Sequence, residues 1–373
     1  MKNYIKKLLT IFFSSSLAFV FLLLGIVYLG DPLQLFHSKS SSNLIVPNAR
    51  HQVAAMINNR SFDSIILGAS YLENTSGYEA SKILGGSFIN ISINGSDFHE
   101  RLVILKHALE KKSLKKVIYS LDHAGLIDSR IRDTSSFDFL YDKYKYNDLK
   151  IYITPKYLIC SIYNSYCLKP AEEDRPFAWY KDKEFNKRLG GFENWLHPEN
   201  SFQVNNALKR IASTIEKIKL GITDKTIKNT LPESQKYLDT MLIDYVAIYP
   251  DTEFILVLPP LSRVRNALDA QYYVGVFERY TQNIQYLVSK TSSYSNLKIY
   301  GWGNHSFVDD ISNYSDLGHH HFQINSWMLD AISQNEGLLT IANINPYLNL
   351  LKNKSLEFNL NEIGDEIDDY FKQ

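Results

Sequence analysis

The stretch Ser64–Ser70, SIILGAS in one-letter code, decides the fold class of this 373-residue chain. Its first four residues form a short apolar run that is typical of a buried strand. The Gly-Ala-Ser that follows predicts a tight turn from the strand into a helix, with the hydroxyl of Ser70 exposed at the turn. Ser70 is therefore a candidate nucleophile at the carboxyl end of a strand.

Four further apolar runs repeat this plan along the chain: Phe88–Asp97, Lys116–Leu121, Phe254–Pro260 and Leu297–Tyr300. Helical patterns separate them, so we expect an α/β fold, a three-layer α/β/α sandwich around a central parallel five-stranded sheet. The second run ends in Asn-Gly and opens a helix from Asp97 to Lys111, for which Ser96 is a candidate N-cap. Ligands of such sheets bind beyond the carboxyl ends of the strands, where Ser70, Gly95 and Asp122 fall.

A second motif, Asp316-Leu317-Gly318-His319, lies near the C-terminus. A serine hydroxyl is a poor nucleophile at neutral pH, and it needs an adjacent imidazole that a carboxylate orients. Asp316 and His319 are three residues apart, which brings both side chains to the same side of one turn. Folding would then bring them to Ser70 from the far end of the sequence.

The run His319–His321, together with Asp316 and His305, also has the composition of a metal site. Zinc needs three or four converging ligands, whereas adjacent residues in a strand or turn point in different directions. We therefore favour the catalytic interpretation and expect no metal.

These motifs resemble the SGNH/GDSL-type hydrolases, whose core sheet is flavodoxin-like. The resemblance is to the membrane-anchored branch related to surface-polysaccharide O-acyltransferases and to the D-alanine transfer proteins of teichoic-acid biosynthesis. Residues 67–70 resemble the first block of that superfamily, which implies Ser70 as nucleophile. Residues 90–96 resemble the second block, which implies the backbone N–H of Gly95 as an oxyanion donor. The last block, Asp-x-x-His, implies Asp316 and His319 as the rest of a triad.

The chain departs from that family in two places. Ala69 replaces the usual aspartate of the first block, and Ser120–His123 stands where the family has Gly-x-Asn-Asp. Asn94 is then the candidate for a side-chain oxyanion donor. Asp122 and His123 end a strand at the predicted active edge and could contact substrate.

The N-terminus predicts a membrane anchor. Lys2, Lys6 and Lys7 precede the apolar span Leu8–Leu29, which has the length needed to cross a bilayer as a helix. The lysines favour a cytoplasmic N-terminus and a body outside the cytoplasm, periplasmic or extracellular. No small-x-small cleavage site follows, so a signal anchor is preferred to a cleaved signal peptide. A buried core helix of a soluble protein is not expected, because such a helix would keep a polar face.

Composition changes along the chain predict its domain organisation. We expect an N-terminal anchor over 1–30, a linker over 31–60, an SGNH-like catalytic domain over 61–336 and a C-terminal extension over 337–373. The whole chain contains 25 Tyr and 20 Phe, and many of these aromatic residues fall within residues 126–230. That segment interrupts the strand pattern and is interpreted as an inserted, aromatic-rich cap, although such aromatics are more often core.

Charge and cysteine content limit the partners. The formal net charge of +0 gives no electrostatic argument for nucleic acid, and no motif indicates a cofactor. Cys160 and Cys167 could form a disulfide outside the cytoplasm or remain two buried thiols.

The sequence therefore predicts a single-pass enzyme of the cytoplasmic membrane, a serine esterase or O-acyltransferase. Its partners would be a cell-envelope polysaccharide or an acyl donor, with acetyl as the first choice of acyl group, and a membrane-bound O-acyltransferase. The alternative is a non-catalytic glycan-binding or assembly subunit that docks on such a transferase. Convergence of Ser70, His319 and Asp316 would separate the two hypotheses.

Overall fold

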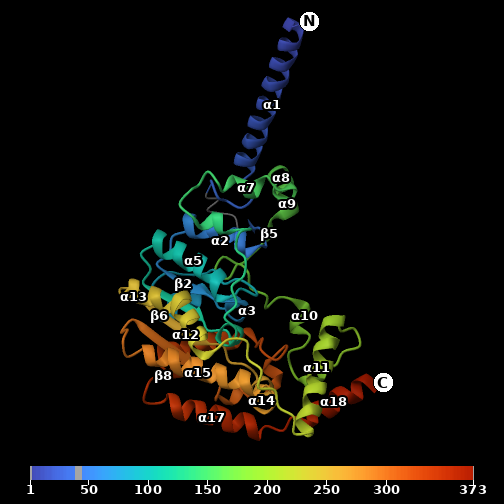
Figure 1. Cartoon of the computed structure of the whole chain (residues 1–373), viewed down its shortest axis with the longest axis vertical. Coiled ribbons are helices and arrows are strands. Elements are labelled where there is room, and N and C mark those ends of the chain that lie inside the picture. The colour runs from blue at the N-terminus through green and yellow to red at the C-terminus, as the bar shows by residue number, and fades with distance from the viewer. Residues whose placement is uncertain (1, 38–43, 373) are drawn as a thin grey trace. The chain divides into compact units, whose positions relative to one another are not determined.

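The computed structural model describes residues 2–37 and 44–372, and the chain divides into two compact units. Unit 1 comprises Met1–Ser61 and Asp133–Glu173, and unit 2 comprises Phe62–Arg132 and Asp174–Gln373. Figure 1 labels the helices and strands of both. The predicted triad residues all belong to unit 2.

Unit 2 contains a mixed α/β fold around a six-stranded sheet in the order β3-β2-β4-β6-β7-β8. Its strands are β2 (Ser64–Leu67), β3 (Phe88–Asn90), β4 (Lys116–Ser120), β6 (Glu253–Leu258), β7 (Leu297–Gly301) and β8 (Leu338–Leu339). The first five named are those predicted from the sequence, and each pairs in parallel with its neighbours among them. The expected five-stranded sheet is wrong by one strand, because β8 adds an antiparallel edge through the pair Ile299↔Leu339. Two residues are too few to show a strand period in sequence.

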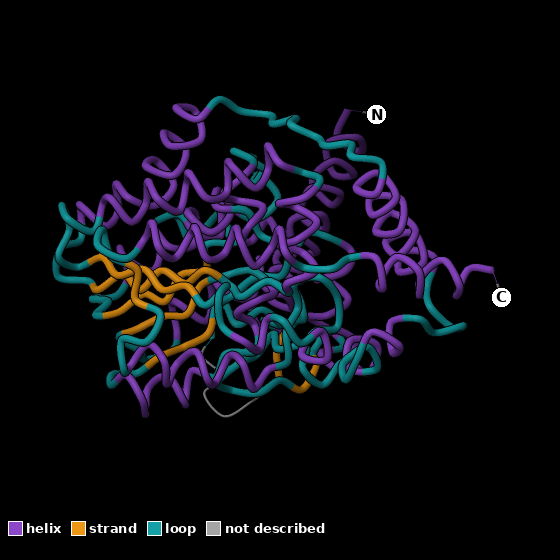
Figure 2. The backbone as a smooth tube through the Cα atoms, turned by 90° about the horizontal axis from the view of Figure 1, so that it is seen from below, coloured by secondary structure: helices purple, strands orange, loops and turns teal. Residues whose placement is uncertain are grey.

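Helices pack on both faces of this sheet (Figure 2), and every residue of its central strands β2, β4 and β6 is buried except the first residue of β4 and of β6. On one face, Ile66, Ile118 and Ile255 form a cluster with Met328 of α16. On the other face, the Phe98 ring of α5 lies 5.8 Å from that of Tyr119. The helices of unit 2 are α3 (Ser70–Glu73), α4 (Gly77–Leu84), α5 (Phe98–Lys111), α6 (His123–Ile127), α10 (Lys183–Asn186), α11 (Phe202–Lys219), α12 (Leu231–Leu238), α13 (Asp244–Ile248), α14 (Arg263–Gln271), α15 (Val274–Lys290), α16 (Phe322–Ser333), α17 (Ile344–Glu357) and α18 (Asn361–Lys372).

The helix α5 begins one residue later than predicted. Asp97, not Ser96, is its N-cap, because the Asp97 carboxylate accepts the Glu100 N–H at 2.8 Å and the Glu100 carboxylate accepts the Asp97 N–H at 3.1 Å. This reciprocal capping box satisfies two backbone donors at once, whereas with Ser96 as N-cap the third helical residue would be His99, which has no carboxylate to accept the second bond. The Ser96 hydroxyl lies instead 3.4 Å from the backbone oxygen of Gly68, at the turn that precedes Ser70.

Unit 1 differs from the linker expected over residues 31–60. Its elements are α1 (Lys2–Gly30), β1 (Leu44–Ile45), α2 (Ala49–Asn59), α7 (Leu149–Tyr152), α8 (Pro155–Ile162), α9 (Asn164–Cys167) and β5 (Lys169–Pro170). The strands β1 and β5 pair antiparallel, and α2 is mostly buried. The predicted cap over 126–230 is likewise not one body, because 133–173 belong to unit 1 and 174–230 to unit 2. The pairing of β1 with β5 joins segments more than a hundred residues apart, which no local pattern reveals.

The helix α1 is long and apolar enough to cross a membrane or to act as a signal anchor, and only 6% of its apolar window is buried within the chain. An N-terminal helix with so little of its apolar surface covered by protein is typical of a membrane span or of a signal sequence. Just after it, the buried carboxylate of Asp31 accepts backbone N–H groups from Leu35 at 2.9 Å and His37 at 2.7 Å. The Tyr152 hydroxyl of α7 donates to the same carboxylate at 2.5 Å. The segment that leaves α1 is thus held within unit 1.

The two cysteines, whose state the sequence left open, form a disulfide between α8 and α9. The Cα atoms of Cys160 and Cys167 lie 5.5 Å apart. Both side chains are buried in unit 1.

Candidate active site

Ser70 lies where the sequence predicted, at the step from β2 into α3. Ala69 is extended, with φ −92° and ψ −157°, and Ser70 is the first residue of α3. Gly68 permits this turn, because a Cβ atom there would lie 2.8 Å from the Cβ of Ser120 on β4. The Gly68 N–H donates to the Ser92 hydroxyl at 3.1 Å, which connects the turn to the segment after β3. The nucleophile turn is therefore held from two neighbouring strands.

Three predicted residues meet in one hydrogen-bonded line. The Ser70 Oγ lies 2.8 Å from Nε2 of His319, and the His319 Nδ1 lies 2.7 Å from Oδ2 of Asp316. Because the Asp316 carboxylate can only accept, Nδ1 carries the imidazole proton and Nε2 is left to accept the serine proton. Folding brings together a serine and a histidine that are 249 residues apart in sequence.

Asp316 is held as an anion. Its Oδ1 accepts the backbone N–H groups of Gly318 at 2.9 Å and His319 at 2.8 Å, while Oδ2 faces the imidazole. Loss of hydration on burial raises the pKa of the Asp316 carboxyl. The hydrogen bonds from His319 and Gly318 and the positive charge of a protonated His319 have the opposite and larger effect, so the pKa of Asp316 is lowered to about 2. The carboxylate therefore stays ionised and keeps His319 in the tautomer that a base requires.

Aromatic side chains hold the imidazole, and sequence reasoning did not assign them to the site. The Tyr71 ring stacks on His319 with centroids 5.1 Å apart, and Trp179 and Phe185 approach it at 5.5 and 5.6 Å. The Trp179 indole N–H also donates to the backbone oxygen of Ser70 at 2.8 Å. Tyr71 directly follows the nucleophile and Trp179 lies in the aromatic-rich segment, but nothing in their spacing marks them as neighbours of His319.

The predicted oxyanion donors lie in the loop after β3. Asn94 and Gly95 are exposed, and Gly95 has a positive φ of 61°, which favours glycine. The Ile93 N–H donates to the backbone oxygen of Gly68 at 2.8 Å, which pairs this loop with the turn before Ser70. The Arg132 guanidinium donates to the Gly95 oxygen at 2.6 Å. These bonds fix the loop beside the nucleophile turn.

Asp122 and His123 take different positions. Asp122 is in a buried ion pair, 2.5 Å from the Arg101 guanidinium, and also accepts the Ser120 hydroxyl. Burial raises the pKa of Asp122, although Arg101 opposes that rise. Its carboxylate is thus committed to protein partners. His123 lies 2.9 Å from the Asp269 carboxylate and borders a cavity, and burial lowers its pKa.

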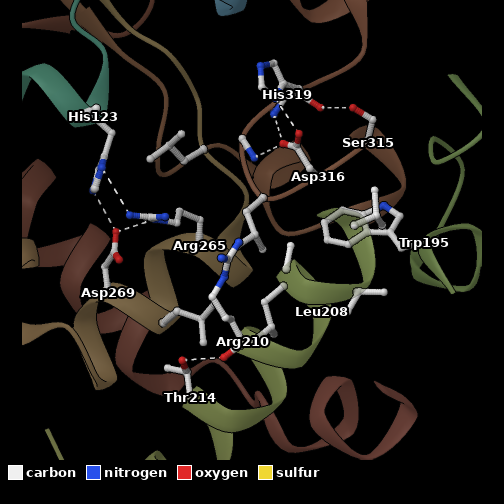
Figure 3. Close-up of a pocket in the computed structure, with 18 of the residues that line it drawn as sticks. His123, Trp195, Leu208, Arg210, Thr214, Arg265, Asp269, Ser315, Asp316 and His319 are labelled. Atoms are coloured by element: carbon white, nitrogen blue, oxygen red, sulfur yellow. Dashed lines mark hydrogen bonds and ion pairs between the residues drawn. The ribbon is translucent and has the colours of Figure 1, made fainter. Parts of the chain in front are cut away.

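A cavity of about 630 Å³ adjoins the Asp316–His319 side of the triad (Figure 3). Its walls come from α11, α14 and the loop over 315–319, and they are mainly apolar, with Trp195, Leu208 and Leu268 among them. The side chains of Arg210 and Arg265 reach into it from the two helices (Figure 3). Tyr71 and His319 border the cavity but Ser70 does not, so the space lies on the imidazole side of the nucleophile.

The neighbouring histidines do not join His319. His320 is buried, with Nδ1 3.3 Å from the backbone oxygen of His321, and burial lowers its pKa to about 4. The His321 Nδ1 accepts the Gln323 N–H at 3.2 Å as the N-cap of α16. Within residues 2–37 and 44–372, no three His, Cys, Asp or Glu side chains are grouped as metal ligands would be.

No protein-family model matches the chain, and neither curated proteins nor solved structures give a match. The chemistry of the site therefore has to be inferred from its geometry. A hydroxyl, an imidazole and a carboxylate in one line can act as nucleophile, base and orienting group.

Proposed function

We propose that this chain is a membrane-anchored, extracytoplasmic serine esterase or O-acyltransferase of SGNH type that acts on acyl groups of a cell-envelope polysaccharide. The observation that carries the proposal is the line from Ser70 through His319 to Asp316, with distances of 2.8 and 2.7 Å. The first distance lets His319 accept the proton of the nucleophile, and the second lets Asp316 hold the imidazole in place.

The reaction divides into two steps. The Ser70 Oγ bonds to the acyl carbonyl carbon while its proton passes to Nε2 of His319. The bond from that carbon to the leaving alcohol then breaks, and the imidazolium returns the proton to the alcohol oxygen. Water or a sugar hydroxyl next attacks the acyl carbon of the acyl-enzyme while its proton passes to His319. The bond from that carbon to Ser70 Oγ then breaks, the imidazolium returns the proton to Oγ, and a free acid or a new ester leaves. The backbone N–H groups of Ser70 and Gly95, with the Asn94 amide, are the candidate donors to the oxyanion.

The position of the cavity supports an alcohol of sugar size. Because His319 delivers a proton to the leaving oxygen, the alcohol must lie on the imidazole side of Ser70, and this is the side that the cavity occupies. Its volume of about 630 Å³ is in the range of ordinary ligand sites. Trp195 in its wall offers a ring of the kind that stacks on sugars.

The N-terminal helix and the disulfide support the location. A helix able to cross a membrane forms the N-terminal part of unit 1, and the Cys160–Cys167 bond is typical of an oxidising compartment. Substrates on a cell-envelope polymer would be reached from that side.

A serine-directed fluorophosphonate probe tests the proposal on the full chain in detergent. We expect labelling of the wild-type chain and of Ser295→Ala, a control at an exposed serine before β7, and none of Ser70→Ala, with little change in the melting temperature of either variant. Labelling that persists in Ser70→Ala would assign the nucleophile elsewhere. A folded wild-type chain that takes no label would favour the glycan-binding subunit.

The fate of the acyl group separates the two enzyme classes. With p-nitrophenyl acetate as donor and a soluble oligosaccharide as acceptor, mass spectrometry distinguishes free acetate from an acetylated sugar. Formation of the acetylated sugar would identify a transferase, and formation of free acetate alone would identify an esterase.

A further inference from the structure

In unit 1, α8 lies against the end of α1 at which the apolar span finishes (Figure 1). The two helices approach so closely at Gly30 that a Cβ atom there would lie 2.7 Å from the Cα of Ser161. Only glycine allows this backbone contact. The position of α8 relative to the end of α1 is therefore fixed by packing.

The length of α1 sets the depth of that contact in a bilayer. Its 29 residues extend about 43 Å at 1.5 Å per residue. The hydrocarbon core of a bilayer is about 30 Å thick and takes roughly 20 residues. When Leu8–Leu29 fill that core, Gly30 lies where acyl chains meet headgroups. The α8 helix then lies at the same level.

The surface of α8 and α9 carries an apolar ridge, defined here as Ile159, Ile162, Tyr163 and Tyr166. Their exposed fractions are 44%, 54%, 66% and 65%. Ile159 and Ile162 are three residues apart and lie on one side of α8. Tyr163 follows at the break between the two helices, and Tyr166 lies on α9. The opposite side, with Cys160, Ser161 and Cys167, is buried. Because the disulfide joins the two short helices, the ridge is already formed before anything contacts it.

The composition of the ridge fits the interfacial layer of a lipid bilayer. Single exposed apolar side chains are ordinary on soluble proteins, but a contiguous row indicates a binding surface. Tyrosine is enriched where acyl chains meet headgroups, since one end of its ring is apolar and the other is wet. Lys156 is exposed on α8, and a side chain of this length can keep its ammonium among headgroups.

We infer that α8 and α9 form a membrane foot, with the ridge inserted in the interfacial layer of the leaflet from which α1 emerges. Because α8 packs against the end of α1, the chain then contacts the bilayer through two elements instead of one. A single helix leaves the attached protein free to swivel, whereas a second contact fixes the orientation of unit 1 on the membrane. The inference requires α1 to lie in a bilayer and is independent of catalysis in unit 2.

Quenching by brominated lipids tests the inference on the full chain in nanodiscs. We expect Ile162→Trp to add fluorescence that is quenched strongly by phosphatidylcholine brominated near the carboxyl end of an acyl chain, and less by lipid brominated near the methyl end. Ile248→Trp is the matched control, because Ile248 is 62% exposed and belongs to unit 2. The wild-type chain supplies the background of the native tryptophans. Equal quenching of the two variants, or none of Ile162→Trp, would overturn the inference.

A second measurement needs no substitution. Hydroxyl-radical footprinting of the wild-type chain in nanodiscs should modify Tyr163 and Tyr166 several-fold more slowly than Tyr78, which is 69% exposed in unit 2. When the chain is instead kept soluble by an amphipol without lipid, the modification rates of the three tyrosines should become similar. Rapid modification of Tyr163 and Tyr166 in nanodiscs would show that the ridge faces water and would contradict the inference.

Discussion

Replacing Asp316 by asparagine changes the tautomer of His319 while leaving the shape of the site in place. The amide oxygen of asparagine can still accept the backbone N–H groups of Gly318 and His319, which now lie 2.9 and 2.8 Å from Oδ1. Its NH₂ group then faces Nδ1 of His319 from the position of Oδ2. Because that group donates, Nδ1 must accept, and the imidazole proton moves to Nε2.

In this tautomer His319 cannot act as the base that accepts the proton of Ser70. With a proton on Nε2, His319 donates toward the Ser70 Oγ at the 2.8 Å contact instead of accepting from it. The same exchange in the Ser-His-Asp template lowers turnover by about 10⁴-fold, and we expect a loss of that order for Asp316→Asn. Both backbone bonds persist, so the melting temperature should move by only a few degrees.

Hydrolysis of p-nitrophenyl acetate by the purified full chain measures the turnover, and differential scanning fluorimetry measures the melting temperature. The control is Asp310→Asn, since Asp310 caps a short helix of the same loop region and has no contact with His319 among the described residues. Asp310→Asn should retain wild-type turnover. A stable Asp316→Asn variant with turnover within tenfold of wild type would refute the role given to Asp316.

Three other substitutions probe the surroundings of the site. Trp179→Phe removes the indole N–H that donates to the backbone oxygen of Ser70. The loss of this one hydrogen bond should lower kcat/KM by up to about tenfold. Trp327→Phe is the control and should leave kcat/KM unchanged in the same assay. Arg101→Met leaves the Asp122 carboxylate buried without its ion pair and should cost about 3–5 kcal/mol in urea unfolding, whereas unchanged stability would show that the pair is dispensable. Burial lowers the pKa of His320 from 6.5 to about 4 in the folded chain. Between these two pH values the histidine is protonated in the unfolded chain but neutral in the folded one, so the folded chain loses stability as the pH falls through that window. His320→Gln should reduce that loss by about 3 kcal/mol, measured as the difference in unfolding free energy between the two ends of the window, and equal pH dependence in both chains would contradict the assignment.

Local patterns in the sequence were enough to predict the strands of the parallel sheet and the apolar N-terminal helix. Runs of at least three consecutive apolar residues identify β2, β4 and β6, because strands buried on both faces have no polar side. The Gly-Ala-Ser turn and the Asp-x-x-His spacing likewise depend on neighbouring residues alone. Ser70, Asp316 and His319 could therefore be named as a catalytic hypothesis from the amino-acid sequence by itself.

Contacts between distant segments were decided only by the tertiary structure. The antiparallel β8 and the pairing of β1 with β5 depend on partners far along the chain, so residues 31–60 gave the pattern of a linker. The ring of Trp179 against His319 and the ion pair of Asp122 with Arg101 are likewise unions of separate segments. Periodicity reports which side of an element is buried, but it does not report what covers that side. The 2.8 Å contact of Ser70 with His319 belongs to this second class, because 249 residues of folded chain are needed to make it.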